Sequence, residues 1–196
     1  MPDLLTPEHV EPLLRGRLGR PYRYVDRAES TQRLVGPDDP EGALVVADEQ
    51  TAGRGRLGRS WEAPPGTAVL GSLVLVPAVP AERLAELMVV AAEAVAAAIA
   101  GRMGLQSAVK FPNDVLVEGR KVAGILAEAA EGRVVLGLGV NVNQAEEDLP
   151  LRAVFPATSL AVELGHVVPR APLLADILFE LERRYENWVS DAGARG

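Results

Sequence analysis

Three glycines alternate with three arginines between residues 53 and 59, directly after an apolar run that predicts a strand. The spacing of the three glycines fits the dinucleotide-binding pattern G-x-G-x-x-G. That pattern must open a helix, because the helix N-terminus holds the pyrophosphate of the dinucleotide. The stretch is followed within a few residues by Pro64, Pro65 and Gly66, which prevent a helix from starting there. The sequence therefore argues against a Rossmann fold and predicts an irregular loop at this position.

The loop, residues 47–61, is a basic island in a protein of formal net charge -7. Glycines let a backbone approach a ligand closely, and arginines offer forked donors to carboxylate or phosphate oxygens. Gln50 and Trp61 flank the arginines with groups suited to hydrogen bonding and stacking. We interpret the stretch as an anion-binding loop, with a solvated surface loop as the alternative.

The rest of the chain predicts a single α+β domain with a mixed β-sheet and flanking helices, spanning residues 1–190. Residues 191–196 are expected to form a flexible tail. A helix is expected from Pro80 to a stop at Gly101, because apolar residues recur there at helical spacing. Further helices are predicted at residues 158–164 and 172–189. Strands are predicted at residues 22–26, 43–47, 67–76, 107–110, 115–117, 121–129 and 133–142.

Composition excludes several classes of protein. The sequence pI near 5.0 argues against a protein that mainly wraps nucleic acid. The chain has no cysteine, so disulfides, thiolate metal sites and cysteine nucleophiles are excluded. No signal peptide is evident, and the longest apolar run, residues 87–100, contains Glu93 and is too short to span a bilayer. We expect a soluble cytoplasmic protein without membrane contact.

Only two of the 20 basic residues are lysines, Lys110 and Lys121. A hairpin across Glu118-Gly119 is expected to carry them on neighbouring strands. A lysine amine beside arginines can hold a carboxylate against a phosphate. Asp114 is a candidate magnesium ligand, since Mg²⁺ takes one or two carboxylates plus substrate phosphates. An ordinary Pro-Asn-Asp turn is the alternative explanation for this segment.

An apolar strand near residue 140 contains Gly137 and Gly139 and ends in Asn141. Glycine inside a strand indicates close approach by a ligand or another backbone. An asparagine amide offers both a donor and an acceptor to an adenine edge, although a polar turn at the strand end also explains it. The two histidines lie outside every cluster, so Ser30 is a poor candidate for a triad nucleophile.

Taken together, these clusters resemble the biotin protein ligases. The matching stretches, in the family's order, are residues 30–32, 48–61, 110–114, 121–126 and 137–141. The resemblance implies a catalytic fold like that of class II aminoacyl-tRNA synthetases. It also implies that biotin and MgATP form biotinyl-5'-AMP, with release of pyrophosphate. Biotin then passes to a lysine of a biotin carboxyl carrier protein.

The resemblance also implies a role for individual residues. The catalytic residues would be Lys121, Arg54 and Arg56. Biotin would be bound by Ser30, Thr31, Gln32, Gln50, Arg54, Gly55, Arg56, Lys121 and Gly124. ATP would be bound by Arg56, Arg59, Trp61, Lys110, Asn113 and Asn141, with Asp114 as the Mg²⁺ ligand. The glycine-rich loop is expected to become ordered over the ligand.

This sequence departs from the family pattern at two site positions and at both ends. Gln32 replaces the usual Asn, and Phe111 replaces the usual Trp. Too few residues precede Ser30 for a helix-turn-helix, so no DNA binding is expected, and the C-terminal β-barrel is expected to be truncated or absent. The resemblance implies a homodimer. A lipoate ligase of the same architecture, or a non-catalytic sensor of biotin or biotinyl-AMP, remain the alternatives.

Overall fold

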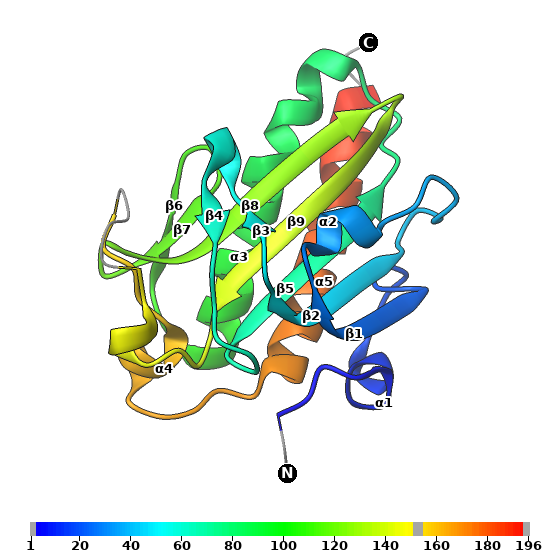
Figure 1. The fold of residues 1–196 in the computed structure, drawn as a ribbon. Coiled ribbons are helices and arrows are strands. Elements are labelled where there is room, and N and C mark those ends of the chain that lie inside the picture. The colour runs from blue at the N-terminus through cyan, green and yellow to red at the C-terminus, as the bar shows by residue number, and fades with distance from the viewer. Residues whose placement is uncertain (1–2, 151–154, 194–196) are drawn as a thin grey trace.

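A seven-stranded mixed sheet forms the centre of the computed structural model, which describes residues 3–150 and 155–193 (Figure 1). The strand order is β1-β2-β5-β9-β8-β7-β6. β1 and β2 are parallel, and all other neighbouring pairs are antiparallel. The strands are β1 (Tyr22–Ala28), β2 (Leu44–Gln50), β5 (Ala68–Leu75), β6 (Ser107–Lys110), β7 (Asp114–Val117), β8 (Arg120–Ala130) and β9 (Arg133–Asn141). The predicted mixed sheet with flanking helices is confirmed.

The two faces of the sheet are covered differently (Figure 1). The long helices α3 (Leu87–Met103) and α5 (Arg170–Gly193) pack on one face and against each other. The short helix α2 (Thr31–Leu34) lies on the other face, against β2, β5 and β9. The two short strands β3 (Gly53–Arg54) and β4 (Ser60–Trp61) pair into a hairpin on that same side. The helix-covered face holds the core, and the other face is left for a site.

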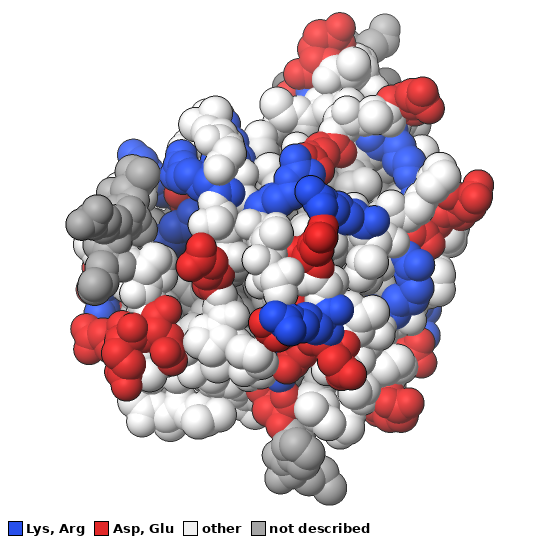
Figure 2. Space-filling view, viewed as in Figure 1, with Lys and Arg blue, Asp and Glu red and all other residues white. Residues whose placement is uncertain are grey.

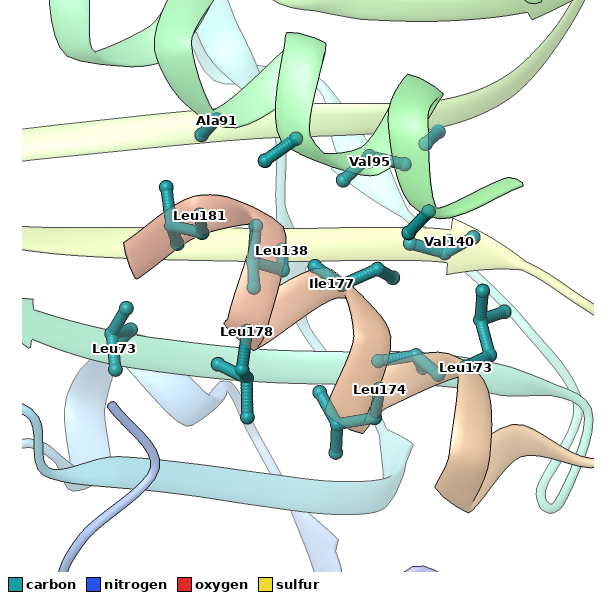
Figure 3. Packing of buried hydrophobic residues seen from close by; sticks show 14 of the residues in the cluster. Leu73, Ala91, Val95, Leu138, Val140, Leu173, Leu174, Ile177, Leu178 and Leu181 are labelled. Carbon is teal, nitrogen blue, oxygen red and sulfur yellow. The ribbon is translucent and has the colours of Figure 1, made fainter. Parts of the chain in front are cut away.

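Residues on β9 alternate between these two faces, as strand geometry requires. Leu138 and Val140 point into the core, where they meet side chains such as Val95 of α3 and Ile177 of α5 (Figure 3). The intervening residues Gly137, Gly139 and Asn141 therefore face away from α3 and α5. The alternation of large apolar residues with glycine fills one face and leaves the other open.

The remaining elements are short. They are α1 (Pro7–Val10), η1 (Glu11–Leu13), η2 (Arg56–Gly58), η3 (Ala81–Glu86), η4 (Glu146–Asp148) and α4 (Leu160–Leu164).

Two predicted helix ends are wrong. The expected stop at Gly101 lies inside α3, which ends at Met103 because Gly104 adopts the left-handed conformation, with φ of 69°. The last helix was expected over residues 172–189, but α5 runs from Arg170 through Gly193, with Ala192 buried against the protein. The rest of the expected tail, residues 194–196, lies outside the described residues.

One helical stretch, Ala81–Met103, is long and apolar enough to cross a membrane by length and composition alone, with a mean hydropathy of 1.9. In the structure α3 packs against α5 and against β6, β7 and β8. Core helices of soluble proteins pass the same composition test, so the stretch is weak evidence for a membrane span.

Arg170, the first residue of α5, is a buried charge that joins four parts of the chain. Its guanidinium lies 2.9 Å from a carboxylate oxygen of Asp48 at the end of β2, and 2.9 Å from one of Asp3. It also donates to the carbonyl oxygen of Ala68 in β5 at 3.0 Å. The side chain is 1% exposed, so its charge depends on these partners for stabilisation.

We expect Arg170→Met to lower the free energy of unfolding by about 3 kcal/mol, because it leaves two carboxylates without their cation. Urea denaturation measures the loss. The matched control is Arg183→Met on the same helix, where an exposed ion pair with Glu180 should contribute less than about 1 kcal/mol. Equal losses in the two variants would contradict the assigned role of Arg170.

Candidate active site

A cavity of about 470 Å³ opens on the sheet face opposite α3 and α5. Its floor is made by strands, and its walls are made by α2 and the β3–β4 hairpin. The strand register places Leu70, Gly139, Gly124 and Asp114 side by side across β5, β9, β8 and β7. Directly paired residues share a face of the sheet, and Gly139, Gly124 and Asp114 of this row line the cavity as its floor.

The two glycines of the floor leave room for the indole ring of Trp61. A Cβ atom at Gly139 would lie 2.7 Å from Trp61 Cε2, and one at Gly124 would lie 2.9 Å from Trp61 Cζ3. Real Cβ atoms do not approach other atoms so closely, so the ring position requires glycine at both places. The Trp61 Nε1 atom is buried, and no described residue accepts its hydrogen bond.

One end of the cavity is organised by a chain of hydrogen bonds. Gln50 Oε1 accepts from the Thr31 backbone N at 2.7 Å and from Thr31 Oγ1 at 3.1 Å. Because Thr31 Oγ1 uses its hydrogen there, it accepts from the hydroxyl of Ser72, 2.7 Å away. These bonds fix the oxygen of Gln50, and its Nε2 group remains as a donor.

The same end contains buried polar atoms that lack a partner. Ser30 Oγ and Gln32 Oε1 are both buried without a hydrogen bond to any described residue. Gln32 Nε2 makes a long bond of 3.4 Å to the carbonyl oxygen of Val135. An unpaired buried polar group costs about 1–3 kcal/mol, so these atoms are better satisfied when a polar ligand fills the cavity.

The other end of the cavity is cationic. Lys121 Nζ lies 2.7 Å from Asp114 Oδ1, and both side chains are mostly buried. Asn113 donates to the same carboxylate oxygen at 3.2 Å and accepts from Arg56 Nη1 at 2.9 Å. Lys121 Nζ also lies 5.5 Å from the centroid of the Trp61 ring. This cluster can bring an amine and a guanidinium to one anionic ligand.

The backbone of Lys121 is held from both sides. Its N–H donates to the carbonyl oxygen of Pro156 at 2.7 Å, and its carbonyl oxygen accepts from the Thr158 N–H at 2.8 Å. The segment around Ala157 thus adds a short parallel bridge beside the start of β8. Because the backbone is fixed, the position of the amine depends on side-chain rotation alone.

The three arginines of the hairpin have different partners. Arg54 makes a two-point ion pair with Glu128 on β8, at 2.7 and 3.1 Å. Arg56 bonds to the neutral amide of Asn113, and Arg59 makes no ion pair with a described residue. At the hairpin tip Leu57 has a φ of 59° and is 83% exposed. Basic side chains gather on this face over the hairpin, with acidic side chains nearby (Figure 2).

Nearly all residues predicted for the site line this one cavity. Those that do are Ser30, Thr31, Gln32, Gln50, Arg54, Gly55, Arg56, Arg59, Trp61, Asn113, Asp114, Lys121, Gly124 and Asn141. Lys110 is the exception, because it is exposed and its Nζ lies 5.8 Å from the ring centroid of Phe155. The expectation that both lysines lie on neighbouring strands is wrong, since β7 separates β6 from β8.

Sequence reasoning missed several residues that shape the cavity. Ser72 lies in a fully buried strand and has no sequence signal other than its polarity. Glu128, seven residues beyond Lys121, forms an ion pair with Arg54, and Phe155 lines the cavity. Neither residue lies in a stretch that matches the family pattern. The glycines inside β9 were a usable signal, because they indicated close approach.

Comparisons with known proteins agree with this geometry. Residues 24–144 match the model of the Biotin/lipoate A/B protein ligase family. The bifunctional ligase/repressor BirA of Bacillus subtilis (strain 168) is 41% identical over 182 residues, covering 88% of this chain and 56% of that relative. The biotin–[acetyl-CoA-carboxylase] ligase of Mycobacterium tuberculosis is 36% identical over 202 residues, covering 95% of this chain and 74% of that relative.

A solved structure extends the likeness to three dimensions. Biotin protein ligase from Aquifex aeolicus, in complex with biotin and ATP, matches with a TM-score of 0.78 and 31% identity, over 86% of this chain and 72% of that one. The chain spans little more than half the length of the Bacillus relatives. Because the family model matches more than half of its residues, the chain belongs to the Biotin/lipoate A/B protein ligase family.

Proposed function

We propose that this chain catalyses ATP-dependent activation of biotin to biotinyl-5'-AMP and transfer of biotin to a lysine of a biotin carboxyl carrier protein. One observation carries the proposal: a single cavity joins an end with unsatisfied polar atoms to an end with Lys121 and Arg56. The names of the relatives, which are biotin ligases, support it over lipoate ligation.

The polar end matches the hydrogen-bonding groups of a cyclic urea such as the biotin ring. A urea has one carbonyl oxygen that accepts and two N–H groups that donate. Gln50 Nε2 and the Ser30 hydroxyl can donate to the carbonyl, and Gln32 Oε1 can accept from an N–H. Thr31 and Ser72 hold Gln50 in the orientation that this match requires.

The cationic end suits attack of a carboxylate on a phosphoryl group. A biotin carboxylate oxygen forms a bond to the α-phosphorus of ATP, the bond from that phosphorus to the β-phosphate oxygen breaks, and pyrophosphate leaves. Two anions must approach each other, so positioned cations supply most of the stabilisation. Lys121 is proposed to act at the reacting carboxylate and α-phosphate, with Arg54, Arg56 and Arg59 beside the carboxylate and phosphates.

Magnesium is proposed to enter with ATP as part of the substrate. The described residues contain no group of three or more His, Asp or Glu side chains that could hold a metal ion. Asp114 is the carboxylate of the cationic cluster, and one of its oxygens already contacts Lys121. Substrate phosphates would therefore provide most of the oxygen ligands, with Asp114 as the protein ligand.

In the second step the amine of the carrier lysine attacks the biotinyl carbonyl carbon. An amide bond forms, the amine loses a proton, and the bond from the carbonyl carbon to the phosphate oxygen breaks, so that AMP leaves with its electron pair. The proposed reaction needs no covalent enzyme intermediate. The proposed homodimer rests on the family resemblance, and the proposed cytoplasmic location rests on the composition of the sequence.

We expect the protein to label a biotin carboxyl carrier domain when incubated with biotin and MgATP. Mass spectrometry of the carrier and chromatography of biotinyl-AMP measure the two steps. Parallel reactions with lipoate should give at least tenfold less product, as expected if mispaired polar groups cost about 1.4 kcal/mol or more. Biotin binding without biotinyl-AMP would favour a sensor and contradict the enzyme proposal.

Lys121→Ala should slow biotinyl-AMP formation by about 100-fold or more, as removal of a group that stabilises transition-state charge does. The KM for biotin should rise much less, because the amine acts on charge that develops during reaction. Lys121→Arg, which keeps the charge but loses the compact amine, should give an intermediate rate. Equal losses in kcat and in biotin binding would show that Lys121 mainly binds substrate.

The hairpin should become protected from trypsin when biotinyl-AMP binds, because its arginines would then contact the ligand. Cleavage after Arg54, Arg56 and Arg59 is followed by mass spectrometry. In the free protein Glu128→Gln should speed this cleavage by about two- to fivefold, since exposed ion pairs contribute up to about 1 kcal/mol. Unchanged cleavage with and without the ligand would exclude ordering of the hairpin over the ligand.

A further inference from the structure

Four polar side chains are buried together where β9 ends and α4 begins. They are Asn141, Gln144, Thr158 and Ser159, each at most 5% exposed. Asn141 Nδ2 donates to the carbonyl oxygen of Thr158 at 3.0 Å, and Gln144 Nε2 donates to Asn141 Oδ1 at 2.8 Å. Ser159 Oγ donates to the carbonyl oxygen of Gln144 at 2.7 Å. Of these four residues, Asn141 alone lines the cavity.

The chemistry of the partners fixes the direction of both amides. The carbonyl oxygen of Thr158 can only accept, so it requires the nitrogen of Asn141. The oxygen of Asn141 must then face Gln144, which must present its own nitrogen. Reversal of either amide would bring two oxygens or two nitrogens together. Asn141 therefore has one orientation, with one N–H and one oxygen lone pair still uncommitted.

This arrangement leaves a defect at Gln144. Its Oε1 atom is buried without a hydrogen bond to any described residue, and the side chain is 1% exposed. A buried oxygen without a partner costs about 1–3 kcal/mol, whereas an apolar side chain of similar size would avoid that cost. The Gln144 side chain donates its hydrogen bond to Asn141, so a benefit that offsets this cost would come from its effect on Asn141.

We infer that Gln144 is a positioning residue, which fixes the Asn141 amide so that Asn141 reads one hydrogen-bonding atom on the edge of the adenine base. The inference rests on the proposed function, which brings ATP into this cavity. The Thr158 N–H bond to the backbone of Lys121, at 2.8 Å, does not involve the Gln144 side chain, so the proposed effect is confined to nucleotide recognition.

The test compares wild type with Gln144→Met and Gln144→Glu, using ATP, 1-deaza-ATP, 3-deaza-ATP, 7-deaza-ATP and the triphosphate of purine riboside. Calorimetry gives nucleotide affinities, and biotinyl-AMP formation gives kcat and KM. In wild type, loss of the atom that Asn141 reads should weaken binding about five- to tenfold, the value of one hydrogen bond. The Gln144→Met variant should bind the same analogue less than about twofold more weakly than it binds ATP. In this variant Asn141 no longer makes the hydrogen bond to ATP, so removing the base atom has little further effect on affinity.

The two variants act differently on Asn141. Methionine removes the donor to its oxygen, while the carboxylate of Gln144→Glu can only accept and so favours the reversed amide. In both variants ATP should bind about as weakly as the critical analogue, with kcat and the KM for biotin changed less than about twofold. Gln106→Met, at an exposed position, is the matched control and should behave as wild type.

Three results would overturn the inference. The first is that folded Gln144 variants discriminate among the analogues as wild type does. The second is that wild type binds every analogue as tightly as ATP, and the third is that kcat and the KM for biotin deteriorate as much as the affinity for ATP. If thermal unfolding shows that Gln144→Glu does not fold, Gln144→Met carries the test. Wild-type protein that binds nucleotide but makes no biotinyl-AMP would contradict the proposed function alone, and failure to bind any nucleotide would overturn both.

Discussion

The absence of side chains at Gly124 and Gly139 is the constraint on which the rest of the site depends. The sheet register places these glycines next to each other on β8 and β9, between Leu70 and Asp114. A flat ring can approach the backbone there, as the Trp61 indole does. Because β9 places Leu138 and Val140 on the opposite face, the strand that forms the cavity floor also anchors α3 and α5. Core packing and ligand access are therefore properties of the same strand.

The cavity combines fixed and unsatisfied polar groups. Thr31 and Ser72 orient Gln50, while the buried oxygens of Ser30 and Gln32 find no hydrogen-bond partner among the described residues. The fold tolerates this cost because the core on the other face is apolar and continuous. Groups that are already desolvated and oriented lose little entropy when a ligand arrives. The unpaired groups lower the stability of the free protein. A ligand with matching polar groups removes this cost when it binds, and the free energy recovered favours binding.

The sequence predicts the strands and most of the cavity lining, since apolar runs, turn residues and glycines in strands are local signals. It did not predict that Lys110 would lie outside the cavity, because β7 pairs between the strands of the two lysines and adds a bulge beside Val115. The roles of Ser72 and Glu128 were also missed, because they too depend on long-range contacts. Their roles depend on partners 41 and 74 residues away in sequence, which local patterns do not encode.

The arginines of the β3–β4 hairpin can exchange their partners for a ligand at a small cost in free energy. Arg54 is held by a carboxylate that is itself half-exposed, and Arg56 by a neutral amide. Contacts of both kinds contribute about 1 kcal/mol or less, far below a buried ion pair such as that of Arg170. A phosphate or carboxylate ligand offers each guanidinium a stronger charge-assisted bond. The hairpin is thus stable enough to stay folded over the sheet, yet its contacts are weak enough for an anionic ligand to replace them.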